Sequence, residues 1–221
     1  MAEAIDGVTG QAPRDRSRRG RATKDPAGRT QILDAAVACI LELGFYRAST
    51  NEIARRANVS WGAIQYYFGS REALMIAAAE ELNRRFIDAI AERHVEGDTL
   101  ETRIHSLYDL LAQYYSEPTF LARLQILLNL QHDPDTSADA TESLRSQAER
   151  VAGEIRRLLT ETLGEDADPG RSTVLFHAIR GFAISQQLAE SACPPIAERE
   201  AATRTRFLAG IVATELQARN A

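Results

Sequence analysis

Apolar residues recur at helical spacing along most of the chain, beginning near residue 30. A stripe such as Ile32, Ala36 and Ile40 follows a period of about 3.6 residues, which is that of an α-helix and not of a strand. No segment alternates apolar and polar residues as a half-buried strand does, and no internal repeat is found. The pattern therefore predicts an all-α protein. The expected helices span residues 30–43, 49–57, 61–68, 70–96, 99–115, 120–130, 138–163, 172–190 and a last segment that ends near residue 218.

Capping residues mark the helix boundaries in the N-terminal third of the chain. Thr30 is expected to cap the first helix, and Gly44 to end it in the left-handed conformation. Asn58 suits a second left-handed turn. Serines that can accept a hydrogen bond from a helix N-terminus precede the next three helices, at Ser49, Ser60 and Ser70. Glu52 lies three residues after the first of these serines, which is the spacing of a capping box. Short helices joined by such a turn have the spacing of a helix-turn-helix inside a three-helix domain.

The helix over residues 61–68 has one apolar face and one face suited to close contact with DNA. At 100° per residue, Ile64 and Phe68 fall together and are expected to face the core. Small and hydrogen-bonding residues fall on or beside the opposite face, namely Gly62, Ala63, Gln65, Tyr66 and Tyr67. A glutamine can bond the N6 and N7 atoms of adenine, with about 1–3 kcal/mol of discrimination. We therefore expect this helix to lie in a major groove.

Phosphate contacts are expected around the same helix. The free amides at the start of the helix over residues 49–57, next to Thr50, can bind a phosphate. Arg71 and the tyrosine hydroxyls can reach other phosphate oxygens, which fixes register without reading sequence. Asn51, one turn into its helix, can touch a base.

These residues resemble the DNA-binding domain of the TetR family of transcriptional regulators over residues 30–82. The matching strings are Ile32-Leu33-Asp34-Ala35-Ala36, Gly44-Phe45, Glu52-Ile53-Ala54, Ala57-Asn58-Val59-Ser60, Tyr66-Tyr67-Phe68 and Ser70-Arg71-Glu72-Ala73-Leu74. The resemblance implies a homodimer on a palindromic operator and a helical C-terminal domain that senses a small molecule, usually in a repressor. Carried over by position, the base-proximal residues are Asn51, Trp61, Gly62, Ala63, Gln65 and Tyr66. The phosphate contacts carried over in the same way are Thr50, Tyr67 and Arg71.

Trp61 departs from the family pattern, which commonly has a lysine, another basic residue or a polar residue at this position. An indole cannot pair with phosphate as a cation does, although it can contact a sugar or a thymine methyl group. Two interpretations of Trp61 stay open: contact with DNA, or closure of the edge of the domain core.

Charge and composition divide the chain into three parts. Residues 1–71 carry 11 Arg and Lys against 7 Asp and Glu, a net charge of +4, whereas residues 72–221 carry a net charge of −9. Such a basic end favours approach to a polyanion. We expect a disordered basic arm over residues 1–28, a DNA-binding domain over residues 29–75 and a ligand-binding and dimerisation domain over residues 76–221. The arm is interpreted either as a solvated tail or as an additional contact with DNA.

The C-terminal helices are expected to form both a core and a pocket. Aromatic and histidine side chains are the best pocket candidates because they combine bulk with a few polar tips. These are Phe86, His105, Tyr108, Tyr115, Phe120, Phe176 and His177. For each of them, ordinary core packing is the alternative. The effector is expected to be a partly apolar small molecule, and the apolar faces of the last two helices are expected to form a four-helix dimer interface.

Other classes of protein are disfavoured. The chain has no catalytic motif, no phosphate-binding glycine loop and no metal spacing, so we expect neither an enzyme nor a cofactor. No apolar run is long enough for a transmembrane helix, and the N-terminus does not read as a secretory signal. Cys39 and Cys193 are interpreted as reduced cytoplasmic thiols. A repressor released by its ligand is the main hypothesis, with an activator or a non-sensing DNA-binding protein of the same fold as alternatives.

Overall fold

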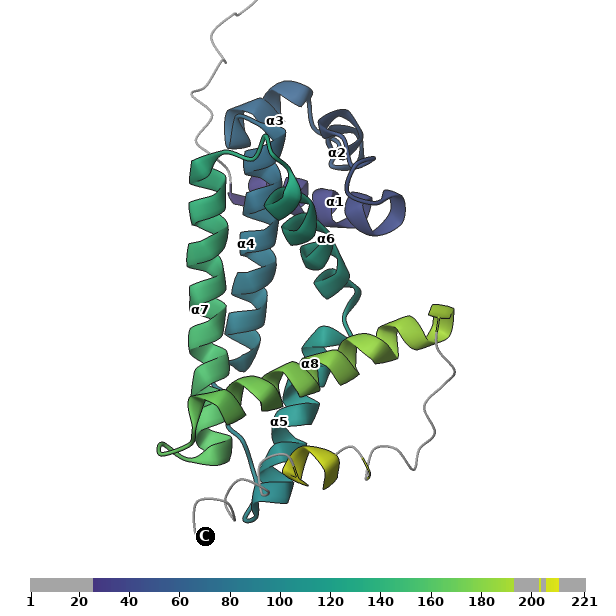
Figure 1. Cartoon of the computed structure of the whole chain (residues 1–221). Coiled ribbons are helices and arrows are strands. Elements are labelled where there is room, and N and C mark those ends of the chain that lie inside the picture. Colours follow the sequence, from purple (N-terminus) through teal and green to yellow (C-terminus); the bar gives the residue numbers. More distant parts are fainter. Residues whose placement is uncertain (1–25, 193–202, 204–205, 211–221) are drawn as a thin grey trace, which may run out of the picture.

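The computed structural model describes residues 26–192, 203 and 206–210, and it is all-α, with no strand among these residues. The helices are α1 (Pro26–Leu43), α2 (Thr50–Arg56), α3 (Trp61–Phe68), α4 (Arg71–Ile90), α5 (Leu100–Tyr115), α6 (Pro118–His132), α7 (Ala138–Leu163) and α8 (Pro169–Ala192). Helices α1, α2 and α3 gather at one end of the molecule, and α5 and α8 lie at the other (Figure 1). The long helices α4 and α7 run side by side between the two ends.

Two hydrophobic cores follow each other along the molecule, and α4 contributes to both. The first core joins α1, α2 and α3 to the first half of α4, as far as Leu82, and includes Ala122, Ile126 and Leu130 from α6. The second core begins with Phe86 of α4 and continues through α5, α7 and α8. The expected domain boundary after residue 75 thus falls inside a continuous helix, and the packing changes between Leu82 and Phe86.

Helix α1 starts earlier than the sequence pattern predicted. It begins at Pro26, so residues 26–28 are helical and do not belong to the expected arm. Proline is favoured in the first turn because its φ is already helical and its missing N–H would have no partner there. The predicted cap at Thr30 is therefore wrong: its hydroxyl donates to the carbonyl of Pro26 over 3.0 Å, within the helix. The basic residues from Arg14 to Lys24 lie outside the described residues.

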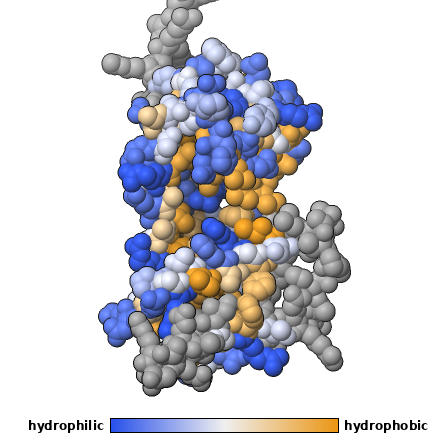
Figure 2. Space-filling view, in the orientation of Figure 1, coloured by the Kyte–Doolittle hydropathy of each residue, from blue (hydrophilic) through white to orange (hydrophobic). Residues whose placement is uncertain are grey.

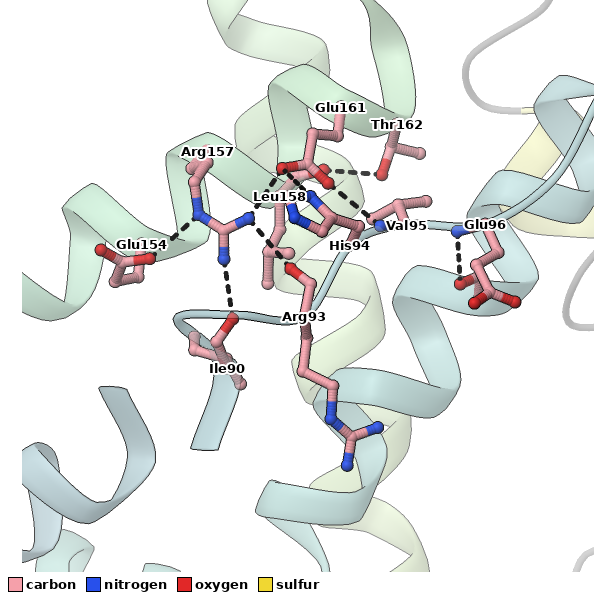
Figure 3. A network of polar contacts seen from close by, with 11 residues as sticks. Ile90, Arg93, His94, Val95, Glu96, Glu154, Arg157, Leu158, Glu161 and Thr162 are labelled. Carbon is pink, nitrogen blue, oxygen red and sulfur yellow. Dashed lines mark hydrogen bonds and ion pairs between the residues drawn. The ribbon is translucent and has the colours of Figure 1, made fainter. Parts of the chain in front are cut away.

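Helix α4 ends at Ile90 and does not reach residue 96 as expected. The cause is an arginine on α7 (Figure 3): Arg157 donates to the carbonyls of Ile90 over 2.8 Å and of Arg93 over 3.0 Å. Glu161, one turn further along α7, accepts the amide hydrogen of Val95 over 3.0 Å. Since the last carbonyls of a helix have no partner within it, this pair of charges holds the chain in its turn towards α5.

The C-terminal helices follow the sequence pattern closely. Helix α7 has the predicted bounds, whereas α6 and α8 each begin at a proline a few residues before the expected start. A short helical segment at residues 206–210 belongs to the expected last helix, most of which lies outside the described residues, as does Cys193. Cys39 is a buried free thiol, and burial raises its pKa. None of the described helices is long and apolar enough to cross a membrane.

Candidate functional site

Local hydrogen bonds fix the turn between α2 and α3. The hydroxyl of Ser60 accepts the amide of Ala63 over 3.2 Å and caps α3 as predicted. Asn58 has a φ of +49°, which confirms the left-handed turn. The amide of Val59 donates to the carbonyl of Ala54 over 3.0 Å and closes the turn behind it. The geometry of this helix-turn-helix is therefore determined by hydrogen bonds between residues that are close together in the sequence.

Ser49 caps α2 as predicted, but the reciprocal half of the capping box is absent. The Ser49 hydroxyl accepts the amide of Glu52 over 3.2 Å. The Glu52 carboxylate pairs instead with Arg55 at 2.7 Å and with Arg56 at 2.8 Å. Two charge-assisted bonds three and four residues along the helix outweigh one bond to a neutral amide. These bonds lower the pKa of Glu52 to about 2.

Helix α3 presents its small and aromatic residues to solvent. Ile64 is fully buried in the first core, as expected, and Phe68 packs against that core. On the other side, Trp61 is 54% exposed and Tyr66 is 49% exposed. Trp61 is not among the partly buried residues that pack against the first core, which favours its interpretation as a DNA contact. Of the other predicted contact residues on α2 and α3, Asn51 and Gly62 are exposed, and Thr50, Ala63, Gln65 and Tyr67 are half-buried.

Arg71 has a structural role that the sequence did not indicate. Its guanidinium donates to the carbonyl of Phe45 over 2.6 Å and to that of Ala48 over 3.3 Å. It also lies 4.5 Å from the centre of the Phe45 ring. Burial lowers the pKa of Arg71. Arg71 therefore ties the start of α4 to the turn between α1 and α2, and part of its hydrogen-bonding capacity is used within the protein.

Two residues of that turn were missed by the sequence analysis. Tyr46 is 79% exposed, and Arg47 is exposed and forms no ion pair with any described residue. They stand three and two residues before Ser49, close in sequence to the N-terminus of α2. Helical periodicity could not identify them, because they lie between helices. The available signal was an aromatic and a basic residue just before a capping serine.

The predicted pocket residues separate into different places. Three of them line one cavity of about 770 Å³ between α6, α7 and α8, namely Tyr115, Phe120 and Phe176. Phe86 is stacked on Tyr114, with 3.7 Å between ring centres, and lines a smaller cavity of about 240 Å³.

The other three predicted pocket residues do not reach the larger cavity. His105 lies in an open polar hollow, where it pairs with Asp109 at 3.3 Å. Tyr108 is buried in the second core, and His177 is exposed on α8. These residues were predicted from the type of their side chains alone. Whether a residue reaches the cavity depends instead on the helix face on which it lies.

Charged residues in the larger cavity were also missed. Its walls are largely apolar, and they include Arg123, Arg156 and Arg180. Arg123 extends from α6 to the buried side chain of Asn83 on α4, to which its Nε donates. The Asn83 amide in turn donates to Gln147 of α7 over 3.1 Å. A buried polar chain thus links the cavity wall to α4.

The comparisons with known proteins agree with this arrangement. Residues 32–78 match the model described as "Bacterial regulatory proteins, tetR family". The chain is 27% identical over 165 residues to the HTH-type transcriptional regulator BetI of Cronobacter sakazakii, covering 68% of this chain and 76% of BetI. It is 32% identical over 131 residues to the HTH-type transcriptional repressor Rv1474c of Mycobacterium tuberculosis, covering 59% and 66%.

A solved structure shares the whole fold. The multidrug binding protein EbrR, crystallised with ethidium, superposes with a TM-score of 0.62 at 22% identity, over 85% of this chain and 99% of EbrR. The outward face of α3, the family match over the helix-turn-helix and the similarity to named regulators lead to one conclusion. Residues 32–78 form a DNA-binding domain of the tetR type, and the chain is a DNA-binding transcriptional regulator similar to BetI.

Proposed function

We propose that this regulator is a repressor that binds a palindromic operator as a homodimer and is released by a small molecule in the cavity between α6, α7 and α8. The observation that carries the proposal is the exposed face of α3, where Trp61, Gly62 and Tyr66 point away from the first core. An exposed indole beside a glycine has little structural use, but it fits a surface that another macromolecule covers. The similarity to a protein named as a repressor favours repression over activation.

The DNA contacts proposed are those predicted from the sequence, with two additions. The base-proximal set comprises Asn51, Trp61, Gly62, Ala63, Gln65 and Tyr66. The phosphate set comprises Thr50, Tyr67 and Arg71, to which the structure adds Tyr46 and Arg47. Backbone contacts of this kind give affinity and register, whereas α3 gives specificity. The regulator acts where the chromosome lies, in the cytoplasm.

One recognition helix is too short to read a whole operator, so a dimer is needed. Helix α3 has 8 residues and is therefore only about 12 Å long, which is enough to read a few base pairs. Two copies placed about 34–36 Å apart would read successive major-groove faces. Exposed apolar side chains support an interface at the C-terminal end: Val174 on α8 is 50% exposed, and Phe207 is 58% exposed. Apolar surface over α6 and α8 is visible in Figure 2.

The two cores suggest how occupancy of the cavity reaches the DNA. Helix α4 packs in both cores and carries Arg71 at its first turn. A ligand that shifts α6 or α7 relative to α4 would therefore move α3 relative to its copy in the dimer. Because the two recognition helices must match half-sites at a fixed spacing, such a movement would weaken binding to the operator.

Trp61 provides the experiment, because it is the only tryptophan of the chain. Fragments enriched from the source genome would identify the operator, and the emission of Trp61 would then report binding. We expect operator DNA to quench or shift this emission, and an effector to restore it. A scrambled duplex of the same length at the same salt concentration is the control. Unchanged emission with saturating operator, or tight binding by a protein that stays monomeric, would contradict the proposal.

A further inference from the structure

The cavity between α6, α7 and α8 has the size of a ligand site. Its volume of about 770 Å³ lies within the range of about 300–1,000 Å³ that is usual for small-molecule pockets. Leu124 and Leu127 of α6 and Val151 and Leu159 of α7 line it. Tyr115 and Phe120 line it as well, and their rings meet edge to face with 4.8 Å between their centres. The walls therefore suit a largely apolar molecule.

The charged residues of this cavity are mainly cations. Its lining contains Arg123, Arg156 and Arg180 but only one carboxylate, that of Glu165. Glu165 lies two residues after the end of α7, in the turn towards α8. Arg123 of α6 and Arg180 of α8 line the same cavity as Tyr115, so two helices bring positive charge to it.

Among the residues that the structure describes, these cations have no anionic partner. Arg180 lies 5.2 Å from the centre of the Phe176 ring and, like Arg156, forms no ion pair within the described part of the chain. Arg123 donates to the neutral amide oxygen of Asn83. A guanidinium beside apolar walls is stabilised by an oxyanion, to which it can present two parallel N–H groups. An aromatic or quaternary cation would instead meet charges of its own sign.

From this distribution we infer that the effector is an anionic amphiphile, with an acidic head group bound by Arg123 and Arg180 beside Tyr115 and an apolar body along α6 and α7. The inference rests on the proposed function in one respect, namely that this cavity holds the effector. It also gives Arg123 a second role, because the same side chain binds Asn83 of α4. A head group that draws the guanidinium towards the cavity weakens that bond and so acts on the helix that carries the DNA-binding end.

Three probes of equal chain length test the charge preference directly. Isothermal titration calorimetry of the full chain would compare dodecanoate, dodecan-1-ol and dodecyltrimethylammonium, each below its micellar concentration. We expect dodecanoate to bind most tightly, with an affinity at least about tenfold above that of the alcohol, since a charge-assisted hydrogen bond is worth that factor or more. The quaternary ammonium ion should bind most weakly. Equal affinities, the reverse order or no binding of dodecanoate would overturn the inference.

Variants of Arg180 separate specific binding from a detergent effect. Arg180 is exposed on α8 and forms no hydrogen bond with another described side chain, so Arg180→Met should leave the fold intact. It should lower the affinity for dodecanoate about tenfold and leave that for dodecan-1-ol unchanged. Arg180→Glu should narrow or reverse the preference between dodecanoate and dodecyltrimethylammonium.

Arg145→Met is the matched control, because Arg145 is an exposed arginine of α7 that pairs with Glu142 and Glu149 and does not line the cavity. An equal loss of dodecanoate binding in the Arg145 and Arg180 variants would mean that the anion is attracted by general surface charge, and would also overturn the inference.

An operator-binding assay in the same probes distinguishes this inference from the proposed function. Dodecanoate that binds through Arg180 but leaves the operator complex intact would support the ligand class and contradict ligand-dependent release. An operator complex that dissociates with dodecyltrimethylammonium and ignores dodecanoate would support release and contradict the ligand class. Dissociation by dodecanoate in the wild type but not in Arg180→Met would support both.

Discussion

Gln65 is the residue of α3 with the most specific expected role. It is half-buried beside the exposed Tyr66, and its amide can form two hydrogen bonds with an adenine. We expect Gln65→Ala to relax base preference at one position in each half-site by about 1–3 kcal/mol. Measured affinities for a set of operator variants would show the effect, with Asn58→Gly in the adjoining turn as a control that should keep the original preference. If Gln65→Ala discriminates between bases as the wild type does at every operator position, Gln65 does not contact a base.

Arg71 and Arg47 allow structural and DNA-binding roles to be separated. Arg71→Met removes the bonds to the carbonyls of Phe45 and Ala48, so we expect the free energy of unfolding to fall by about 1–3 kcal/mol. Arg47→Met should change that free energy by no more than about 0.5 kcal/mol, because the side chain is exposed.

Operator affinity and its salt dependence complete this comparison. Both variants should bind all sequences more weakly, and Arg47→Met should reduce the slope of log affinity against log salt by about 1. Chemical denaturation and filter binding at several salt concentrations are the measurements. Wild-type stability in Arg71→Met would show that its internal bonds contribute little.

At the residue level, the sequence predicted what depends on near neighbours. The caps at Ser49, Ser60 and Ser70 and the left-handed Asn58 were all correct, because their partners lie three residues away or in the same turn. The internal bonds of Arg71 were not predictable, since Phe45 lies 26 residues before it in the chain. An arginine at this position has the same appearance in the sequence whether it binds phosphate or its own protein.

At the level of helices, the hydrogen bonds of Asn83 to α6 and α7 offer the sharpest test of how the helices are held together. Asn83 is only 2% exposed on α4, where it binds Arg123 of α6 and Gln147 of α7. Asn83→Ala leaves the buried Gln147 and the half-buried Arg123 without that bond, so we expect a loss of about 1–3 kcal/mol in the free energy of unfolding. Glu80→Ala, one turn earlier, removes only an exposed pair with Arg150 and should cost less than about 1 kcal/mol.

Binding measurements extend this test to signalling between the domains. If the hydrogen bond from Arg123 to Asn83 of α4 transmits the effect of a ligand in the cavity, Asn83→Ala should still bind dodecanoate but should release the operator less completely. A variant that loses binding and release in equal measure would instead assign Asn83 to folding alone. The comparison needs calorimetry and operator titration on the same preparation.

Helix boundaries show where the sequence pattern was sufficient and where it was not. The bounds of α7 were predicted, and the helix is flanked by Ser137 as its N-cap and Gly164 as its C-cap. Helices α1, α6 and α8 start earlier than expected because each begins at a proline, which the apolar pattern does not mark but which favours the first turn of a helix. The end of α4 depends on Arg157, 67 residues away from Ile90, and no local pattern contains that information.

At the level of the whole molecule, acid should weaken the fold through two carboxylates. Arginine hydrogen bonds lower the pKa of Glu52 and of Glu81 from 4.5 to about 2. A depressed folded-state pKa contributes stability that is fully present above pH 4.5 and is lost as the pH falls towards 2. We therefore expect the free energy of unfolding to decrease steadily through this range.

Neutral variants would test this acid dependence. The double variant Glu52→Gln and Glu81→Gln should be less stable at pH 7 and show a flatter decline between pH 4.5 and 2. Glu101→Gln, an exposed carboxylate that forms no ion pair with a described residue, should retain the wild-type slope. Denaturant titrations at a series of pH values would measure all three proteins. An unchanged slope in the double variant would contradict the expectation.

The cavity was predicted only in part because it depends on how the helices pack against each other. Bulk and polarity selected Tyr115, Phe120 and Phe176, which three different segments bring to one cavity. They could not exclude His177, which lies next to Phe176 in sequence but on the outer side of α8. Arginines within apolar helices were a signal that could have been used.

The continuity of α4 sets a rule for building hybrid sensors from this protein. A chimera that joins its DNA-binding end to the sensing helices of another regulator has to be fused within α4, between Leu82 and Phe86, where one core gives way to the next. The phase of that fusion matters as much as its position. One inserted alanine would rotate the recognition end by about 100° and advance it by about 1.5 Å, whereas an insertion of seven residues nearly restores the original facing.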